Sequence, residues 1–296
     1  MKTTRAHVNI CRAAFIIGLF CTSCCFVDSW HPQFFWSIET REIKTVLCFV
    51  VPLILTCADF LAEKSLKFVG TATAVLMNVC FVLFFLDRWT VNLVARIGND
   101  KILFHFMYSM ISFFTVLAAS WLCAAASRSK KANLGIMLRR FSLGYLPLCA
   151  LLFILMFFAL REFDNINVSS NIVPFKGEIG CLIYYAKTSQ LTASLIIHSV
   201  GNVLYFTALA IVLCGCLKKF RVPLAFLIPV ALSVFIETFQ YVTKSGDADV
   251  DDIILNSLGA LIGVLIYIIL IKPFITEENY AGNNRSDGRR SRRHQS

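Results

Sequence analysis

Long apolar runs separated by short polar segments dominate the chain, and eight of them are long enough to span a membrane. The hydrocarbon core of a bilayer is about 30 Å thick and requires about 20 mainly apolar residues per helix. The runs are continuous and do not alternate apolar with polar residues, so they predict helices and not the strands of a barrel. The expected spans are approximately residues 10–27, 45–62, 69–86, 103–126, 141–160, 191–217, 222–242 and 252–271. The pattern therefore predicts an all-α polytopic membrane helix bundle.

The composition agrees with a lipid environment. Hydrophobic residues make up 57% of the 296 residues, charged residues only 16%, and the mean hydropathy is +0.71. Phenylalanine alone contributes 27 residues. A water-soluble globular domain carries a considerably larger charged fraction, so that class is excluded.

The distribution of lysine and arginine predicts the orientation of the bundle. With a cytoplasmic N-terminus, 19 of the 28 basic residues fall on the cytoplasmic side, in the direction of the positive-inside rule. They are Lys2, Arg5, Arg12, Lys64, Lys67, Arg128, Lys130, Lys131, Arg139, Arg140, Lys218, Lys219, Arg221, Lys272, Arg285, Arg289, Arg290, Arg292 and Arg293. Eight spans then place both termini in the cytoplasm.

Three regions are expected along the chain. Residues 1–140 hold four spans, residues 141–272 hold the other four, and residues 273–296 form a basic tail that we expect to be disordered. The tail contains the basic run "RSDGRRSRR" at 285–293 and lies where anionic cytoplasmic lipid is the nearest partner. Membrane lipids are therefore the expected partners, and nucleic acid is not.

The twelve cysteines are interpreted as packing residues. Eleven of them lie within or at the edges of apolar spans, where cysteine behaves as a small hydrophobic residue, and only Cys181 falls in an expected external loop. An external disulfide framework therefore has too few members, and we expect no bound cofactor.

Polar residues within the last two spans form two stripes at helical spacing. One stripe consists of Ser233, Glu237 and Gln240, and the other consists of Asp252, Asn256, Gly259 and Gly263. Each set shares one face of its helix, so the two stripes are expected to face each other near the outer surface. The glycines permit a close approach between helices, as small residues do in membrane proteins.

The turn between these spans carries Asp247, Asp249 and Asp251 at alternate positions, like the start of a calcium loop. Asp252 occupies the place of the required glycine and Leu258 the place of the final glutamate, so the calcium-loop motif fails. A hard divalent ion held by carboxylates stays an open alternative. We expect the three aspartates to lie in a short, hydrated external turn.

Four sequence blocks in the C-terminal half resemble a known family. They are "NIVPF" at 171–175, "GNVLYF" at 201–206, "SVFIETFQ" at 233–240 and "DVDDIILNSLGALIG" at 249–263. In order and spacing they resemble the VanZ-like family of teicoplanin-resistance-type integral membrane proteins, over roughly residues 141–271. The resemblance selects Arg161, Asn171, Pro174, Phe175, Asn202, Phe206, Glu237, Gln240, Asp249, Asp252, Asn256 and Gly259. It implies a multi-pass protein of the bacterial plasma membrane that contributes to glycopeptide resistance, and it implies no settled biochemical activity.

Two function classes follow, and the sequence leaves the choice between them open. In the first, the polar cluster binds a lipid or another envelope component without catalysis, and Asn171, Asn202, Gln240, Asp249 and Asn256 form the binding site or its network. In the second, the protein is an enzyme acting on a lipid-linked or cell-wall substrate. The second class assigns Glu237 and Asp252 to acid–base or metal-binding roles and Arg161 to anion binding. No serine or cysteine nucleophile with an adjacent base is evident, so no reaction type can be read. A transporter is a third interpretation, although no inverted repeat is visible.

Polar residues in the N-terminal spans show no matching stripe. Asp59 and Glu63 lie beside Lys64 and Lys67 at the expected cytoplasmic end of the second span. We interpret them as a cluster anchored at the membrane interface, with scaffold or partner-docking helices around it.

Overall fold

The computed structural model describes residues 5–29, 38–63, 65–91, 100–127, 134–154, 170–188, 193–217 and 221–275. Each of the eight expected spans overlaps a long helix. These helices are α1 (Arg5–Ser29), α2 (Ile38–Glu63), α3 (Lys67–Val91), α4 (Asp100–Ser127), α5 (Leu134–Ile154), α7 (Ala193–Cys216), α8 (Arg221–Thr243) and α9 (Val250–Ile266). Among the described residues, four stretches are long and apolar enough to cross a membrane: Val46–Glu63, Ser199–Cys216, Arg221–Thr243 and Val250–Phe274. The predicted all-α membrane bundle is confirmed.

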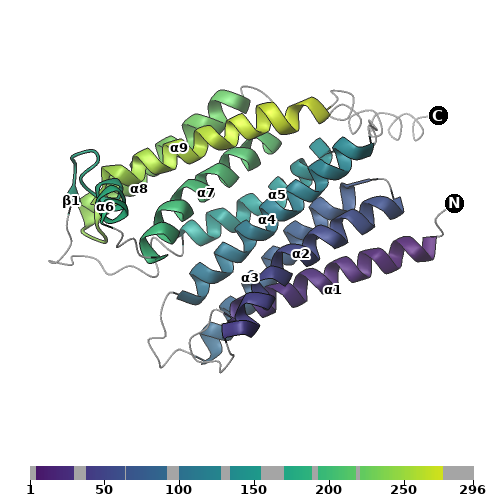
Figure 1. The fold of residues 1–296 in the computed structure, drawn as a ribbon. Coiled ribbons are helices and arrows are strands. Elements are labelled where there is room, and N and C mark those ends of the chain that lie inside the picture. The colour runs from purple at the N-terminus through teal and green to yellow at the C-terminus, as the bar shows by residue number, and fades with distance from the viewer. Residues whose placement is uncertain are drawn as a thin grey trace, which may run out of the picture. The chain divides into compact units, whose positions relative to one another are not determined.

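The sequence pattern did not predict a short helix and two short strands. Helix α6 (Glu178–Lys187) lies in an expected external loop and has no buried residue. Strand β1 (Ser170–Asn171) pairs in parallel with β2 (Ala248–Asp249), with Asn171 opposite Asp249. Figure 1 shows α6 and β1 together at one end of α8 and α9. These elements are too short to show a periodic pattern, and contacts with distant residues hold them in place.

The chain divides into two compact units. The first comprises Met1–Gly144 with Ile268–Ser296, and the second comprises Tyr145–Tyr267. In the first unit, α1 packs against α2, α3 and α4, and α2 also packs against α4. Its core is largely aromatic and aliphatic: the Phe113 and Phe141 rings stack with centroids 4.8 Å apart, and Phe15 and Leu19 are fully buried.

In the second unit, α7 and α9 lie side by side along much of their length (Figure 1). A Cβ atom added to Gly259 would lie 2.3 Å from the backbone oxygen of Val203, and one added to Gly263 would lie 2.4 Å from that of Thr207. The Thr207 hydroxyl donates to the Gly259 carbonyl at 3.0 Å. The predicted close approach at the glycines is confirmed, and the helix they approach is α7.

One face of helix α8, which carries the predicted polar stripe, points into the interior of the second unit. Its buried residues are Ala225, Pro229, Ser233, Glu237 and Gln240, which follow intervals of four and three residues. Leu227, Val234 and Phe235 on the other faces are exposed, as expected for side chains surrounded by lipid. The prediction that Ser233, Glu237 and Gln240 share one inward face is confirmed.

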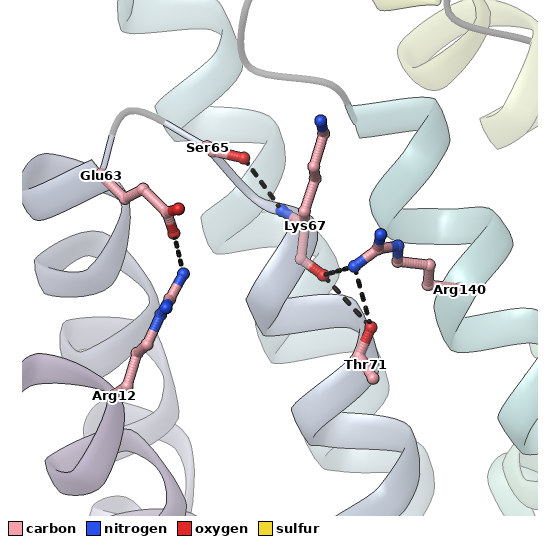
Figure 2. Close-up of polar contacts among 6 residues, drawn as sticks. All are labelled: Arg12, Glu63, Ser65, Lys67, Thr71 and Arg140. Atoms are coloured by element: carbon pink, nitrogen blue, oxygen red, sulfur yellow. Dashed lines mark hydrogen bonds and ion pairs between the residues drawn. The ribbon is translucent and has the colours of Figure 1, made fainter. Parts of the chain in front are cut away.

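The acidic pair at the end of α2 is only partly at the surface. Arg12 of α1 forms an ion pair with Glu63, and Figure 2 shows the two side chains pointing toward each other. Asp59, one helical turn earlier, has an exposed fraction of 0%. The prediction of an interface-anchored cluster is therefore wrong for Asp59, because the side chain faces the packed interior of the first unit. Lys64 lies outside the described residues.

Candidate functional site

The turn between α8 and α9 is closed by a carboxylate from within α8. Glu237 is 7% exposed, and its Oε2 accepts the backbone N–H of Asp249 at 2.9 Å. Asp249 belongs to β2, whose parallel partner β1 contributes Asn171. The Asn171 side chain donates to Asp249 Oδ1 at 2.9 Å. Glu237, Asp249 and Asn171, all selected from the sequence, therefore form one connected network.

Asp249 is the N-cap of α9. Its extended backbone (φ −130°, ψ 122°) places Oδ1 2.8 Å from the N–H of Asp251, which is the usual geometry of a capping aspartate. Its Oδ2 accepts the N–H of Glu178, the first residue of α6, at 3.1 Å. A single carboxylate thus serves the N-termini of two helices, where backbone N–H groups have no intrahelical partner.

Asp251 performs a similar task from inside α9. Oδ1 accepts the N–H of Phe175 at 2.7 Å and Oδ2 accepts the N–H of Ile179 at 3.1 Å. Its side chain has an exposed fraction of 0%, whereas Asp247 is exposed. The expectation that Asp251 is hydrated in an open turn is therefore wrong, because two backbone N–H groups take the place of water.

A second group of polar contacts joins α7 to α9 and α6. Asn202 of α7 donates to Asp252 Oδ1 at 3.0 Å, so these two predicted site residues meet. One turn earlier on α7, the Ser199 hydroxyl makes a short hydrogen bond to Glu178 Oε1. The sequence reading missed Ser199, Glu178 and the capping role of Asp251. The "DVDD" that opens the α9 apolar run was the available signal, because aspartates at the start of a helix are typical caps.

Deeper in the unit, α8 and α9 share a buried amide–hydroxyl pair. Asn256 donates through Nδ2 to Ser233 Oγ at 2.9 Å, and the two residues are 5% and 0% exposed. In the described part of the chain, Asn256 Oδ1 has no hydrogen-bond partner. Gln240 is also buried, at 8% exposed, on the same face of α8. Asn256 therefore presents an acceptor that the described residues do not use.

The carboxylates do not gather as ligands around one point. No group of three His, Cys, Asp or Glu side chains with metal-binding geometry occurs among the described residues. All four side-chain oxygens of Asp249 and Asp251 accept N–H groups, so these residues fit poorly as the ligands of a hard cation. A divalent ion would depend on Glu237 and Asp252. Arg161, the predicted anion-binding residue, lies outside the described residues.

Comparison with known families gives a result for the C-terminal part of the chain. Residues 143–271 match the VanZ/LLP1 family. The resemblance predicted from the four motifs is thereby confirmed over almost the range expected. The matched segment contains the whole second unit, including helices α6–α9. No curated protein and no solved structure gave a match.

Proposed function

We propose that this VanZ-like membrane protein resides in the bacterial plasma membrane and binds a lipid or another envelope component at the polar cluster of α7, α8 and α9. By this binding it contributes to glycopeptide resistance. The family match supports the membrane setting and the link to resistance. The distribution of basic residues supports an external position for the cluster.

The observation that carries the proposal is the unused acceptor of Asn256. An amide oxygen buried in an apolar span without a hydrogen bond costs about 1–3 kcal/mol, so a donor is expected to meet it. A hydroxyl or amide N–H of a bound lipid headgroup would supply such a donor. Ser233, Glu237 and Gln240 line the adjacent face of α8 and offer further polar contacts.

Binding is favoured over catalysis because most of the carboxylate oxygens already accept N–H groups of the protein. Asp249 and Asp251 use their oxygens to hold the ends of α6 and α9, and Glu237 Oε2 holds the N–H of Asp249. A general acid or base must instead have an atom within hydrogen-bond reach of the substrate. The enzymatic alternative therefore rests on Asp252 and on the other oxygen of Glu237.

The test compares Asn256→Leu, Glu237→Gln and Asp252→Asn with the control Asp247→Asn, an exposed residue of the same turn. Membrane abundance, lipid that copurifies with the protein, and teicoplanin susceptibility of the expressing bacteria are measured for each variant. We expect Asn256→Leu to keep its abundance while losing both the bound lipid and the resistance phenotype.

The other outcomes separate the function classes. A Glu237→Gln variant that retains the lipid but loses the phenotype would favour the enzyme. Loss of abundance in all three variants would favour a purely structural network. Retention of lipid and phenotype by all three would refute a functional site at this cluster.

A further inference from the structure

Asp59 is a buried carboxyl in the first unit that the proposed function does not use. It lies in α2, within the membrane-spanning stretch Val46–Glu63, and has an exposed fraction of 0%. Neither Oδ1 nor Oδ2 has a hydrogen-bond partner among the described residues. An ionised carboxylate without hydrogen bonds is very costly in an apolar medium, so something must compensate this charge.

The cations in the described part of the chain do not complete the compensation. Arg12 and Glu63 are the charged groups that act electrostatically on Asp59. Arg12 pairs through Nη2 with Glu63, and its guanidinium lies over the Phe68 ring, 4.8 Å from the centroid. One positive charge thus stands against two carboxylates. Arg12 Nε is itself buried and has no partner in the described residues, so Arg12 does not bind Asp59 through that atom.

Two nearby basic residues, Lys67 and Arg140, do not bind the Asp59 carboxylate. Figure 2 shows the Lys67 side chain extending away from the Arg12–Glu63 pair, while Arg140 donates to the Lys67 carbonyl and to the Thr71 hydroxyl. Helix α4 also packs against α2, and its residues 111–127 contain no Asp, Glu, Lys, Arg or His. The titratable group within residues 111–127 is Cys123, whose Sγ lies 3.7 Å from Cys57 Sγ of α2. On α1, among residues 5–22, the remaining titratable groups are Arg5, His7, Cys11 and Cys21.

We propose that Asp59 is a binding site for one monovalent cation, either a proton taken from water or an alkali metal ion. The cluster of Arg12, Asp59 and Glu63 carries a formal charge of one negative unit when all three groups are ionised, and a single positive charge neutralises it. Such a site on a membrane-spanning helix gives the first unit a chemical role of its own, outside residues 143–271. The proposal is independent of lipid binding at Asn256.

The test uses dicyclohexylcarbodiimide, an apolar reagent that adds to a protonated carboxyl and forms a stable N-acylurea. The full-length protein in lipid nanodiscs is labelled across a pH series, and the adduct is mapped by mass spectrometry. We expect label at Asp59, and we expect the labelling rate to fall about tenfold per pH unit above the titration midpoint as the protonated fraction falls. Asp59→Asn abolishes this adduct, whereas Glu63→Gln, which removes the neighbouring carboxylate, preserves it.

Added salt distinguishes the two cations. If sodium slows the labelling of Asp59 and choline at equal ionic strength does not, the occupant is an alkali metal ion. If neither salt changes the rate, the occupant is a proton. An unlabelled Asp59 at every pH, together with an unlabelled Asp59→Glu variant of normal abundance, would overturn the proposal, because a carboxylate kept charged by internal water does not react.

Discussion

The carboxylate of Asp251 binds the backbone of Phe175, a residue 76 positions earlier in the chain, at 2.7 Å. The same side chain binds the N–H of Ile179 with its other oxygen. Together with Asp249 it fastens the segment from Phe175 to the start of α6 onto the first turn of α9. Helix α6 has no buried residue, so the position of this segment depends on these polar contacts and not on an apolar core.

Replacing Asp251 with alanine is expected to release this segment. Two buried N–H groups lose their acceptor, at a cost of about 1–3 kcal/mol for each group left unsatisfied. Trypsin should then cleave after Lys176 or Lys187 much faster than in the wild-type protein. Asp247→Ala, at an exposed aspartate of the same turn, is the control and should cleave at the wild-type rate. Equal cleavage of the two variants would contradict the fastening role.

Substitution of Gly259 is expected to force α7 and α9 apart. A methyl group there meets the Val203 carbonyl at 2.3 Å, and overpacking of this kind costs about 1–3 kcal/mol. Gly259→Ala should therefore lower the temperature of aggregation in detergent. Gly201→Ala is a matched control on α7, because a Cβ atom at Gly201 meets nothing within 4 Å. If both variants aggregate at the same temperature, the close contact does not govern stability.

Asn202 and Asp252 are expected to be energetically coupled. Their hydrogen bond of 3.0 Å joins α7 to α9. A double-mutant cycle with Asn202→Leu and Asp252→Leu should give a coupling energy of about 0.5–3 kcal/mol, the range for residues in direct contact. Additive effects on unfolding would show that the contact contributes nothing.

Gly177 is expected to tolerate no side chain. A Cβ atom at this position would lie 1.8 Å from Asp249 Oδ2, which already binds the N–H of Glu178. Gly177→Ala must displace a carboxylate held by three donors and should speed the cleavage by trypsin after Lys176, as Asp251→Ala does. Cleavage of the Gly177→Ala variant at the wild-type rate would indicate that the Asp249 side chain moves without a cost in free energy.

The sequence was sufficient for the long helices and for the inward stripe of α8, because membrane spans and 3.6-residue periodicity are both local signals. It also selected both Asn202 and Asp252, which a hydrogen bond joins in the structure. It did not predict α6, the β1–β2 pairing or the burial of Asp251, since each depends on contacts between residues more than 70 positions apart. Asp59 was misjudged for a related reason: Lys64 and Lys67 follow it at the end of the span, but the helix face it occupies is covered by other helices.

The two aspartates that cap α6 also impose an order on biosynthesis. Residues 175–179 emerge from the ribosome well before Asp249 and Asp251, which follow them by 71 to 76 positions. Until α8 has been inserted and α9 has begun to follow, the N–H groups of Phe175, Glu178 and Ile179 have no acceptor from these residues. The segment from Phe175 to the start of α6 can therefore reach its final conformation only after the last hairpin is made, and a chain arrested before Asp249 would leave it open to proteases.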